Sequence, residues 1–136
     1  MKKFLLLVLG AAFLFASCGV REAMKINEAK DNLANAAEVV NEQAPYEVDY
    51  MTTIVSCEFD GKNFIYSYVI DEDYGTIPEM KENGHADDIR SSIEKDWDEN
   101  PELKIMKDNL KKVGGNVVYE YLGNITGETL CIEVVI

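Results

Sequence analysis

Tyrosine is the residue type whose spacing in this sequence most directly suggests a binding surface. Tyr66 and Tyr68 alternate in one strand-like segment, and Tyr119 and Tyr121 alternate in another. Side chains two residues apart on a strand lie on the same face of a sheet. If the two faces coincide and open outward, the rings form a platform for a ligand or a protein partner. A face beneath helices would instead make them part of the core.

Acidic residues occur at calcium-loop spacing, but the rest of that pattern is missing. Asp71, Asp73 and Glu82 occupy positions one, three and twelve of the loop template. Gly75 and Thr76 stand at positions five and six, where the template requires a ligand and a turn glycine. We therefore expect no metal site here, and the sequence contains no other cofactor motif.

His85 is the single histidine of the chain, which restricts the hydrolytic chemistry open to the protein. A zinc site would have to combine His85 with Glu82, Asp87 or Asp88, whereas hydrolytic zinc sites usually take two or three histidines. A catalytic triad would depend on the same histidine, and no nucleophile-elbow motif is present. The sequence therefore predicts a protein that is not an enzyme.

Residues 1–17 have the composition of a lipoprotein signal peptide. Two lysines precede an apolar run over residues 4–15, which is too short to remain as a membrane-spanning helix, and small residues precede Cys18. This order resembles the bacterial lipobox and predicts Cys18 as the lipidated first residue, with residues 18–22 as a short tether. Ordinary secretion with an incidental cysteine is the alternative. Gly19, in place of an acidic residue, favours the outer over the inner membrane.

The other two cysteines, Cys57 and Cys131, both lie in strand-like segments. In an oxidising compartment they could form a disulfide, which would contribute about 4 kcal/mol by closing a long loop. Cysteine also serves in strands as a small buried apolar residue. The sequence leaves both interpretations open.

The chain is strongly acidic, with 25 acidic and 13 basic residues and a formal net charge of −12. Removal of the signal peptide takes away two lysines and no acid, so the net charge becomes −14. Such a charge repels nucleic acid phosphates, and we expect no nucleic acid partner. A hydrated surface is the simplest use of this charge, and a cationic partner is compatible with it.

The hydrophobic pattern predicts a single α+β domain over residues 23–136. Apolar spacing, turn residues and breakers predict, in order, a helix over 21–44, a hairpin over 50–70, one or two helices over 87–113 and a hairpin over 116–136. Asp60 and Gly61 predict the turn of the first hairpin, Asn100 and Pro101 the cap and first residue of the last helix, and Gly114 its end. Residues 71–84 read as a loop. We expect an antiparallel sheet of about four strands with the helices on one face.

A set of polar and aromatic residues runs through both predicted hairpins. Its members are Asn41, Pro45, Asp49, Thr52, Ser56, Asp60, Gly61, Tyr66, Tyr68, Tyr119 and Tyr121. On these residues the chain, from about residue 40 to 136, resembles a widespread group of small, uncharacterised secreted or lipoprotein domains of bacteria. The resemblance supports the α+β fold and implies no activity.

These observations predict a lipid-anchored protein of the bacterial cell envelope that binds a protein partner as a non-enzymatic interaction module. An inhibitor, an immunity protein or an accessory subunit would fit this description. The alternative is a small-ligand carrier or sensor that uses the tyrosine face. A carrier predicts a concave pocket lined by the four tyrosines, whereas an interaction module predicts a flat exposed patch with an acidic rim.

Overall fold

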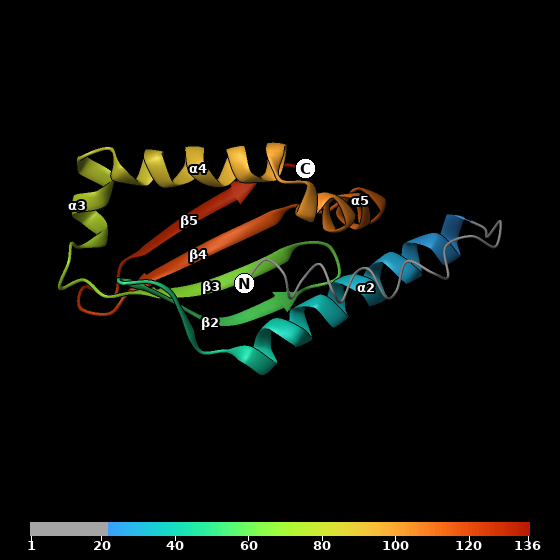
Figure 1. Ribbon diagram of the computed structural model, residues 1–136, viewed down its shortest axis with the longest axis horizontal. Helices are drawn as coiled ribbons and strands as arrows, with labels where there is room; N and C mark the ends of the chain where they lie inside the picture. Colours follow the sequence, from blue (N-terminus) through green and yellow to red (C-terminus); the bar gives the residue numbers. More distant parts are fainter. Residues whose placement is uncertain (1–21) are drawn as a thin grey trace.

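The computed structural model describes residues 22–136, which form one sheet and its covering helices (Figure 1). The elements, in chain order, are α2 (Glu22–Gln43), β1 (Tyr46–Asp49), β2 (Thr52–Phe59), β3 (Phe64–Ile70), α3 (Ile77–Glu82), α4 (His85–Glu99), a 3₁₀ turn (Pro101–Leu103), α5 (Lys104–Val113), β4 (Val117–Gly123) and β5 (Thr129–Val134). The signal peptide and Cys18 lie outside the described residues, so lipidation remains a prediction. None of the described helices is long and apolar enough to cross a membrane.

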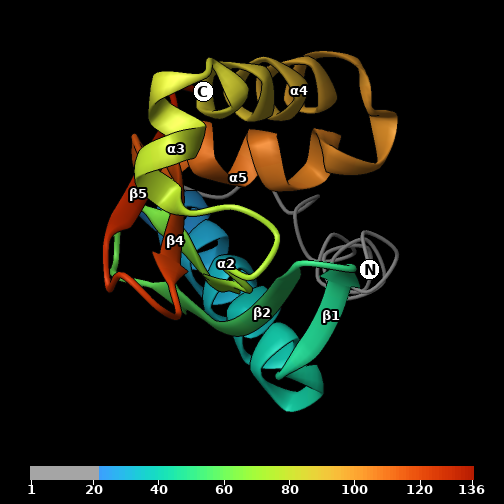
Figure 2. The same ribbon diagram turned by 90° about the vertical axis from the view of Figure 1, so that its left-hand side faces the viewer.

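The helices cover one face of the sheet, as the hydrophobic pattern predicts (Figure 2). Helix α2 packs along β2 and also against α5, while α4 runs near β5. The buried face of α2 is rich in alanine, which allows a helix to approach a sheet closely. It consists of Ala29, Leu33, Ala36, Ala37 and Val40. The α+β class is therefore confirmed.

The sheet has five strands in the order β1-β2-β3-β4-β5, and it is mixed. Strands β3 and β4 pair in parallel, while every other neighbouring pair is antiparallel. The prediction of about four antiparallel strands is therefore wrong in number and in direction. The chain from β3 to β4 carries α3, α4 and α5, and this long connection returns it to the end of the sheet where β3 began.

The sequence pattern does not predict strand β1, because only four residues form it and two of them are acidic. It joins β2 through a tight turn in which the Asp49 carboxylate accepts the Met51 N–H at 3.0 Å. The register shifts between Glu47 and Asp49 and again between Ile54 and Ser56. Bulges increase strand twist, and β1 curls away from the plane of the sheet toward the helix side (Figure 2).

Local capping explains where the helices begin and end. The Asn100 side chain accepts the Glu102 N–H at 2.9 Å, and Gly114 ends α5 with a φ of 67°. The sequence predicts both residues in these positions. Helix α3 lies in the segment expected to be a loop, and it begins at a reciprocal capping box between Thr76, its N-cap, and Glu79 in its first turn.

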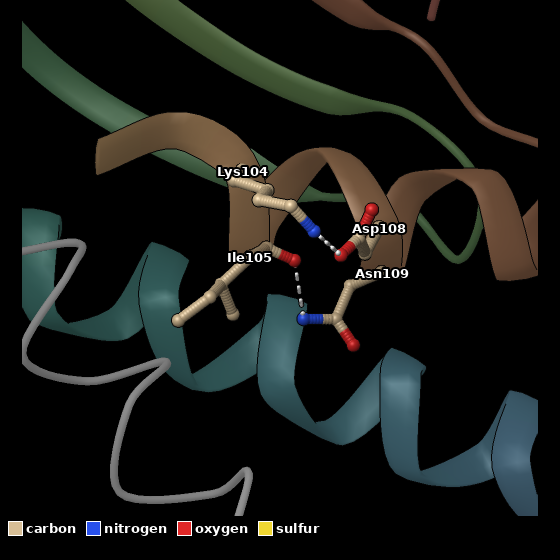
Figure 3. Close-up of polar contacts among 4 residues, drawn as sticks. All are labelled: Lys104, Ile105, Asp108 and Asn109. Atoms are coloured by element: carbon tan, nitrogen blue, oxygen red, sulfur yellow. Dashed lines mark hydrogen bonds and ion pairs between the residues drawn. The ribbon is translucent and has the colours of Figure 1, made fainter. Parts of the chain in front are cut away.

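A buried amide pair joins α2 to α5. Asn32 donates to the Asn109 Oδ1 at 3.3 Å, and Asn109 in turn donates to the Ile105 carbonyl at 2.9 Å. Figure 3 shows Asn109 turned toward α2, with an ion pair between Lys104 and Asp108 beside it at 3.2 Å. Asn109 thus accepts from Asn32 and donates within its own helix, so its buried amide is paired on both sides.

The two cysteines of the domain are free thiols, and they lie on opposite faces of the sheet. Cys57 pairs across from Tyr66 and is buried beneath the helices, whereas Cys131 pairs across from Glu120 and is exposed. Two strands separate β2 from β5. Cys57 and Cys131 therefore do not form a disulfide. The alternative, that both are buried thiols, is correct for Cys57 and wrong for Cys131, which is exposed.

The carboxylate of Glu72 ties the β3–α3 loop to the β4–β5 turn at one end of the sheet. Its side chain is buried, and it accepts the backbone N–H groups of Ile77, Ile125 and Thr126 at 2.7–2.8 Å and also the Thr126 hydroxyl. Gly123 lies against this carboxylate, and a side chain at Gly123 would collide with it. Glu72 thus connects the start of α3 to the β4–β5 turn.

Hydrogen bonds decide the charge state of this buried acid. Burial alone would raise the pKa of the Glu72 carboxyl, but the bonds from Thr126, Ile77 and Ile125 outweigh burial and lower the pKa to about 2. The ionised form is therefore favoured in the folded protein. Its contribution to stability is present above the ordinary pKa of 4.5 and is lost as the pH falls toward 2.

We predict that Glu72→Gln lowers the free energy of unfolding at pH 7, because an amide cannot accept all of these hydrogen bonds. The difference from the wild type should narrow between about pH 4.5 and pH 2. Urea unfolding at a series of pH values measures it. Glu128→Gln, an exposed substitution in the same turn, is the control. A difference for Glu72→Gln that stays constant with pH would contradict this role.

Candidate functional site

The parallel pairing of β3 and β4 brings the four predicted tyrosines into one ladder. Tyr66 lies opposite Tyr119, and Tyr68 lies opposite Tyr121. The rings of Tyr66 and Tyr119 stack with centroids 5.1 Å apart, and those of Tyr68 and Tyr121 stack at 4.9 Å. The rings of Tyr68 and Tyr119 also stack, with centroids 6.1 Å apart, and so connect the two pairs. The prediction that both tyrosine pairs share one face is confirmed.

This tyrosine ladder faces the helices, not the outer side of the sheet. Tyr66 and Tyr121 are buried, whereas Tyr68 and Tyr119 are partly exposed. The expected outward platform is therefore wrong, yet the ladder is not sealed within the core either. The partly exposed rings form the floor of an open groove.

The groove encloses about 600 Å³, within the size range of small-molecule and peptide sites. The tyrosine ladder forms its floor, β1 and the end of α2 form one wall, and α4 forms the other. Its described lining is Val40, Tyr46, Val48, Asp49, Tyr50, Met51, Thr52, Ile54, Tyr66, Tyr68, Ile70, Met80, His85, Ile89, Ser92, Ile93, Asp96, Leu103, Tyr119 and Tyr121. The walls are mainly apolar. The carrier hypothesis predicted a concave site at the tyrosines, and the structure has one. The flat patch predicted for an interaction module is not found at the tyrosines.

All seven tyrosines of the chain gather at this groove. Tyr46 and Tyr50 line it together with the ladder, and Tyr74 packs edge-on against Tyr50 with ring centroids 4.9 Å apart. Tyr50 and Tyr74 are 72% and 61% exposed, so two large rings project at the groove mouth. Sequence reasoning missed these three tyrosines. The alternation of Tyr46, Val48 and Tyr50 was the available signal, since it marks the short strand β1.

Helix α4 stands off the sheet over most of its length. Ile89, Ile93 and Trp97 fall on one helical stripe, but of these three only Trp97 is buried, at 2% exposure. Ile89 and Ile93 are partly exposed and line the groove. The Trp97 indole donates a hydrogen bond of 2.7 Å to the Tyr119 hydroxyl, which ties the C-terminal part of α4 to the ladder.

The groove combines neutral hydroxyls with two carboxylates. Burial, and then the Asp49 carboxylate, raise the pKa of Tyr121 to about 12. Burial also raises the pKa of Tyr119, against the opposing effect of the Trp97 hydrogen bond, with Tyr121 and Asp96 adding to the increase. The ladder hydroxyls therefore stay protonated at neutral pH. Among the described residues lining the groove there is no lysine or arginine.

The other residues considered for chemistry lie apart from the ladder or at its margin. His85 lies at the groove rim and is exposed. Asp71 accepts the Asp73 N–H at 3.1 Å and so stabilises a turn. Within residues 22–136, no group of three histidine, cysteine, aspartate or glutamate side chains is placed to hold a metal ion.

Two solved structures share this fold. No family model and no curated protein sequence matches the chain. A protein from Pseudomonas aeruginosa, described as secreted, superposes with a TM-score of 0.64 at 15% identity, over 86% of this chain and 96% of that one. The type II secretion system pilotin AspS from Vibrio cholerae superposes with a TM-score of 0.56 at 16% identity, over 83% of this chain and 94% of its own. At such identities the likeness concerns the fold alone.

We predict that Tyr119→Phe lowers the free energy of unfolding by about 1–3 kcal/mol, because it leaves the buried Trp97 N–H without its acceptor. Tyr68→Phe removes a hydroxyl from the same ladder without affecting Trp97, and is the control. Urea unfolding followed by fluorescence of Trp97, the single tryptophan, measures both variants. Equal effects of the two substitutions would show that the hydrogen bond does not hold α4 in place.

Proposed function

We propose that this protein is a lipid-anchored accessory protein of the bacterial cell envelope that holds a segment of a protein partner in the tyrosine groove. The observation that carries the proposal is the gathering of all seven tyrosines around one open groove, two of them strongly exposed at its mouth. Tyrosine is enriched at protein interfaces, because it supplies a large contact area at a small cost in conformational entropy.

The shared fold supports a role beside other envelope proteins. One protein with this fold is described as secreted, and another is a pilotin of a type II secretion system. Both are compatible with a small accessory protein that works outside the cytoplasm. The resemblance of residues 1–18 to a lipoprotein signal peptide supports the same location.

The anchor would keep the groove near a membrane. A diacylated Cys18 would supply two acyl chains, which is enough for stable attachment. Residues 18–22 form a short tether in this proposal, and the absence of an acidic residue at Gly19 favours the outer membrane. The partner would then be a protein at or near the same membrane.

We propose a binding role without catalysis, because the groove offers contact surface in place of reacting groups. Its polar groups are protonated tyrosine hydroxyls, the two carboxylates of Asp49 and Asp96, small hydroxyls such as Ser92, and His85 at the rim. The larger part of the lining is aromatic and aliphatic, which suits an apolar segment.

A small-ligand carrier is the second candidate, and the concave shape favours it. A volume of about 600 Å³ fits an organic molecule as well as side chains of a peptide. The exposed rings of Tyr50 and Tyr74 at the groove mouth favour the protein partner, because an enclosed small molecule would not need them.

We predict that Ser92→Trp strongly weakens partner binding, because Ser92 is exposed on α4 and lines the groove, which a tryptophan there would fill. Ser91→Trp, at the adjacent exposed position outside the groove lining, is the matched control. Crosslinking in intact host cells, followed by affinity capture and quantitative mass spectrometry, should show about a tenfold loss of the partner for Ser92→Trp alone.

Equal capture by both tryptophan variants would overturn the groove as the partner site. Native mass spectrometry of the same preparations separates the two candidates. A bound small molecule that is present in the wild type, present in Ser91→Trp and absent from Ser92→Trp would establish the carrier function instead.

We predict that Cys18→Ala releases the protein from the membrane fraction, because it removes the sulfur to which the proposed diacylglyceryl anchor would attach. Fractionation and immunoblotting of cells expressing each form measure the change, and Cys131→Ala serves as the control because that thiol lies in the folded domain. Unchanged membrane association of Cys18→Ala would contradict lipidation.

A further inference from the structure

We propose that one face of α5 lies against the anionic lipid surface of the membrane that holds the anchor. This lysine face consists of Lys104, Lys107, Lys111 and Lys112. The contact rests on the proposed function, in which Cys18 carries the lipid, and it adds the surface by which the folded domain meets the membrane. It follows from where an acidic chain places its positive charge and from where α2 begins.

Positive charge is concentrated on α5. Four of its ten residues are lysines and one is an aspartate, so the helix has a formal charge of +3, whereas the chain without its signal peptide carries −14. The buried residues of α5 are Met106, Asn109 and Leu110, and helical periodicity puts the lysines on the opposite, solvent side. Three of these lysines are exposed, and the fourth, Lys107, is partly exposed.

Helix α5 is fixed against the half of α2 that leads to the anchor. It packs along α2, where the Asn32 side chain donates to the Asn109 Oδ1 at 3.3 Å (Figure 1). Asn32 lies ten residues after Glu22, the first residue of α2, which is about 15 Å along a helix. A tether over residues 18–22 adds at most about 14 Å. The lysine face is therefore within reach of the lipid surface.

A fifth lysine lies beside the C-terminal end of α5. The Phe64 N–H donates to the Asn116 carbonyl at 2.9 Å, which ties the β2–β3 turn to the link between α5 and β4. Lys62 is exposed in that turn, and its carbonyl lies against Gly115. This end of the sheet thus adds positive charge next to the lysine face.

The exposed tyrosines of the groove mouth lie at the opposite end of the sheet. Tyr50 precedes β2 and Tyr74 follows β3, whereas the β2–β3 turn joins the other ends of these two strands. The seven residues of β3 separate the two ends by about 23 Å. Contact through the lysine face would therefore direct the two rings away from the lipid, where a partner can reach them.

Local charge governs such a contact more than net charge does. The Debye length at physiological ionic strength is about 8 Å, so an anionic surface acts mainly on the charges nearest to it. Acidic residues beyond the far end of β3, such as Asp71 and Asp73, lie well outside that range. Lysines held near anionic headgroups add to the attachment that acyl chains supply. The anchor also keeps this surface permanently close, which favours lipid over an acidic protein.

Lysine footprinting in two membranes tests the contact on the lipidated protein purified from host membranes. The protein is reconstituted into nanodiscs of phosphatidylcholine alone or of phosphatidylcholine with phosphatidylglycerol. Labelling by an amine-reactive ester is followed by mass spectrometry. We expect Lys107 and Lys111 to react about threefold more slowly in the anionic membrane, and high salt to remove the difference. Lys81, exposed on α3 at the far end, should react equally in both.

Matched double variants locate the effect. Lys107→Gln combined with Lys111→Gln should bring the labelling of the two remaining lysines in the anionic membrane close to its rate in the neutral one. Lys81→Gln combined with Arg90→Gln removes the same charge from exposed positions on α3 and the first half of α4. This control should leave the protection of the lysine face intact.

Equal labelling of the lysine face in the two membranes would overturn the inference and leave the proposed function standing. Equal labelling together with an amine crosslink from Lys111 to a protein in intact cells would place an acidic partner on this face instead. Failure of the purified protein to enter neutral nanodiscs would contradict the anchor, and with it both the proposed location and the lipid contact.

Discussion

The parallel, in-register pairing of β3 with β4 is the constraint on which the rest of the site depends. It places Tyr66 beside Tyr119 and Tyr68 beside Tyr121, so that two alternating pairs become one stacked ladder. A shift of one residue in this register would send β4's tyrosines to the opposite face. The groove floor would then be lost, and Trp97 would lose its hydrogen-bond acceptor.

The groove exists because two elements above the ladder are held away from it. Bulges in β1 and β2 let β1 curl toward the helix side, where it forms a wall. On the other side, the buried residue of α4 is Trp97, near the C-terminal end of the helix, and this residue is bonded to Tyr119. The rest of the helix faces the open space with partly exposed isoleucines. The site thus combines a rigid floor with a lightly packed wall.

The sequence correctly predicted those turns and helix ends that single residues determine. The turn at Asp60 and Gly61, the cap at Asn100 and the end of α5 at Gly114 all follow from the preferences of single residues, and the structure agrees. The alternation of tyrosines correctly predicted a shared face. The parallel direction of β4 relative to β3 depends instead on where the long connection through α3, α4 and α5 brings the chain back to the sheet. No local pattern encodes that position.

The missed parts of the structure have different physical reasons. Strand β1 is short and acidic and is defined by its pairing with β2, so the alternation of Tyr46, Val48 and Tyr50 was too brief a signal to predict a strand by itself. Helix α3 begins at the capping box of Thr76 and Glu79, a local signal that was present in the sequence. The Glu72 carboxylate that accepts its first N–H also accepts the Thr126 N–H, 54 positions further along the chain, and no local pattern indicates that contact. Such non-local contacts decide the shape of the site, whereas residue types decide its chemistry.

Site-specific photo-crosslinking in intact cells tests the central claim most directly. A photoreactive residue in place of Tyr50, at the groove mouth, should yield a crosslinked adduct with one protein partner. The same residue in place of Val55, which is exposed on β2 away from the groove lining, should yield none. An adduct from Val55 and none from Tyr50 would place the partner elsewhere on the sheet and would contradict a partner site in the tyrosine groove.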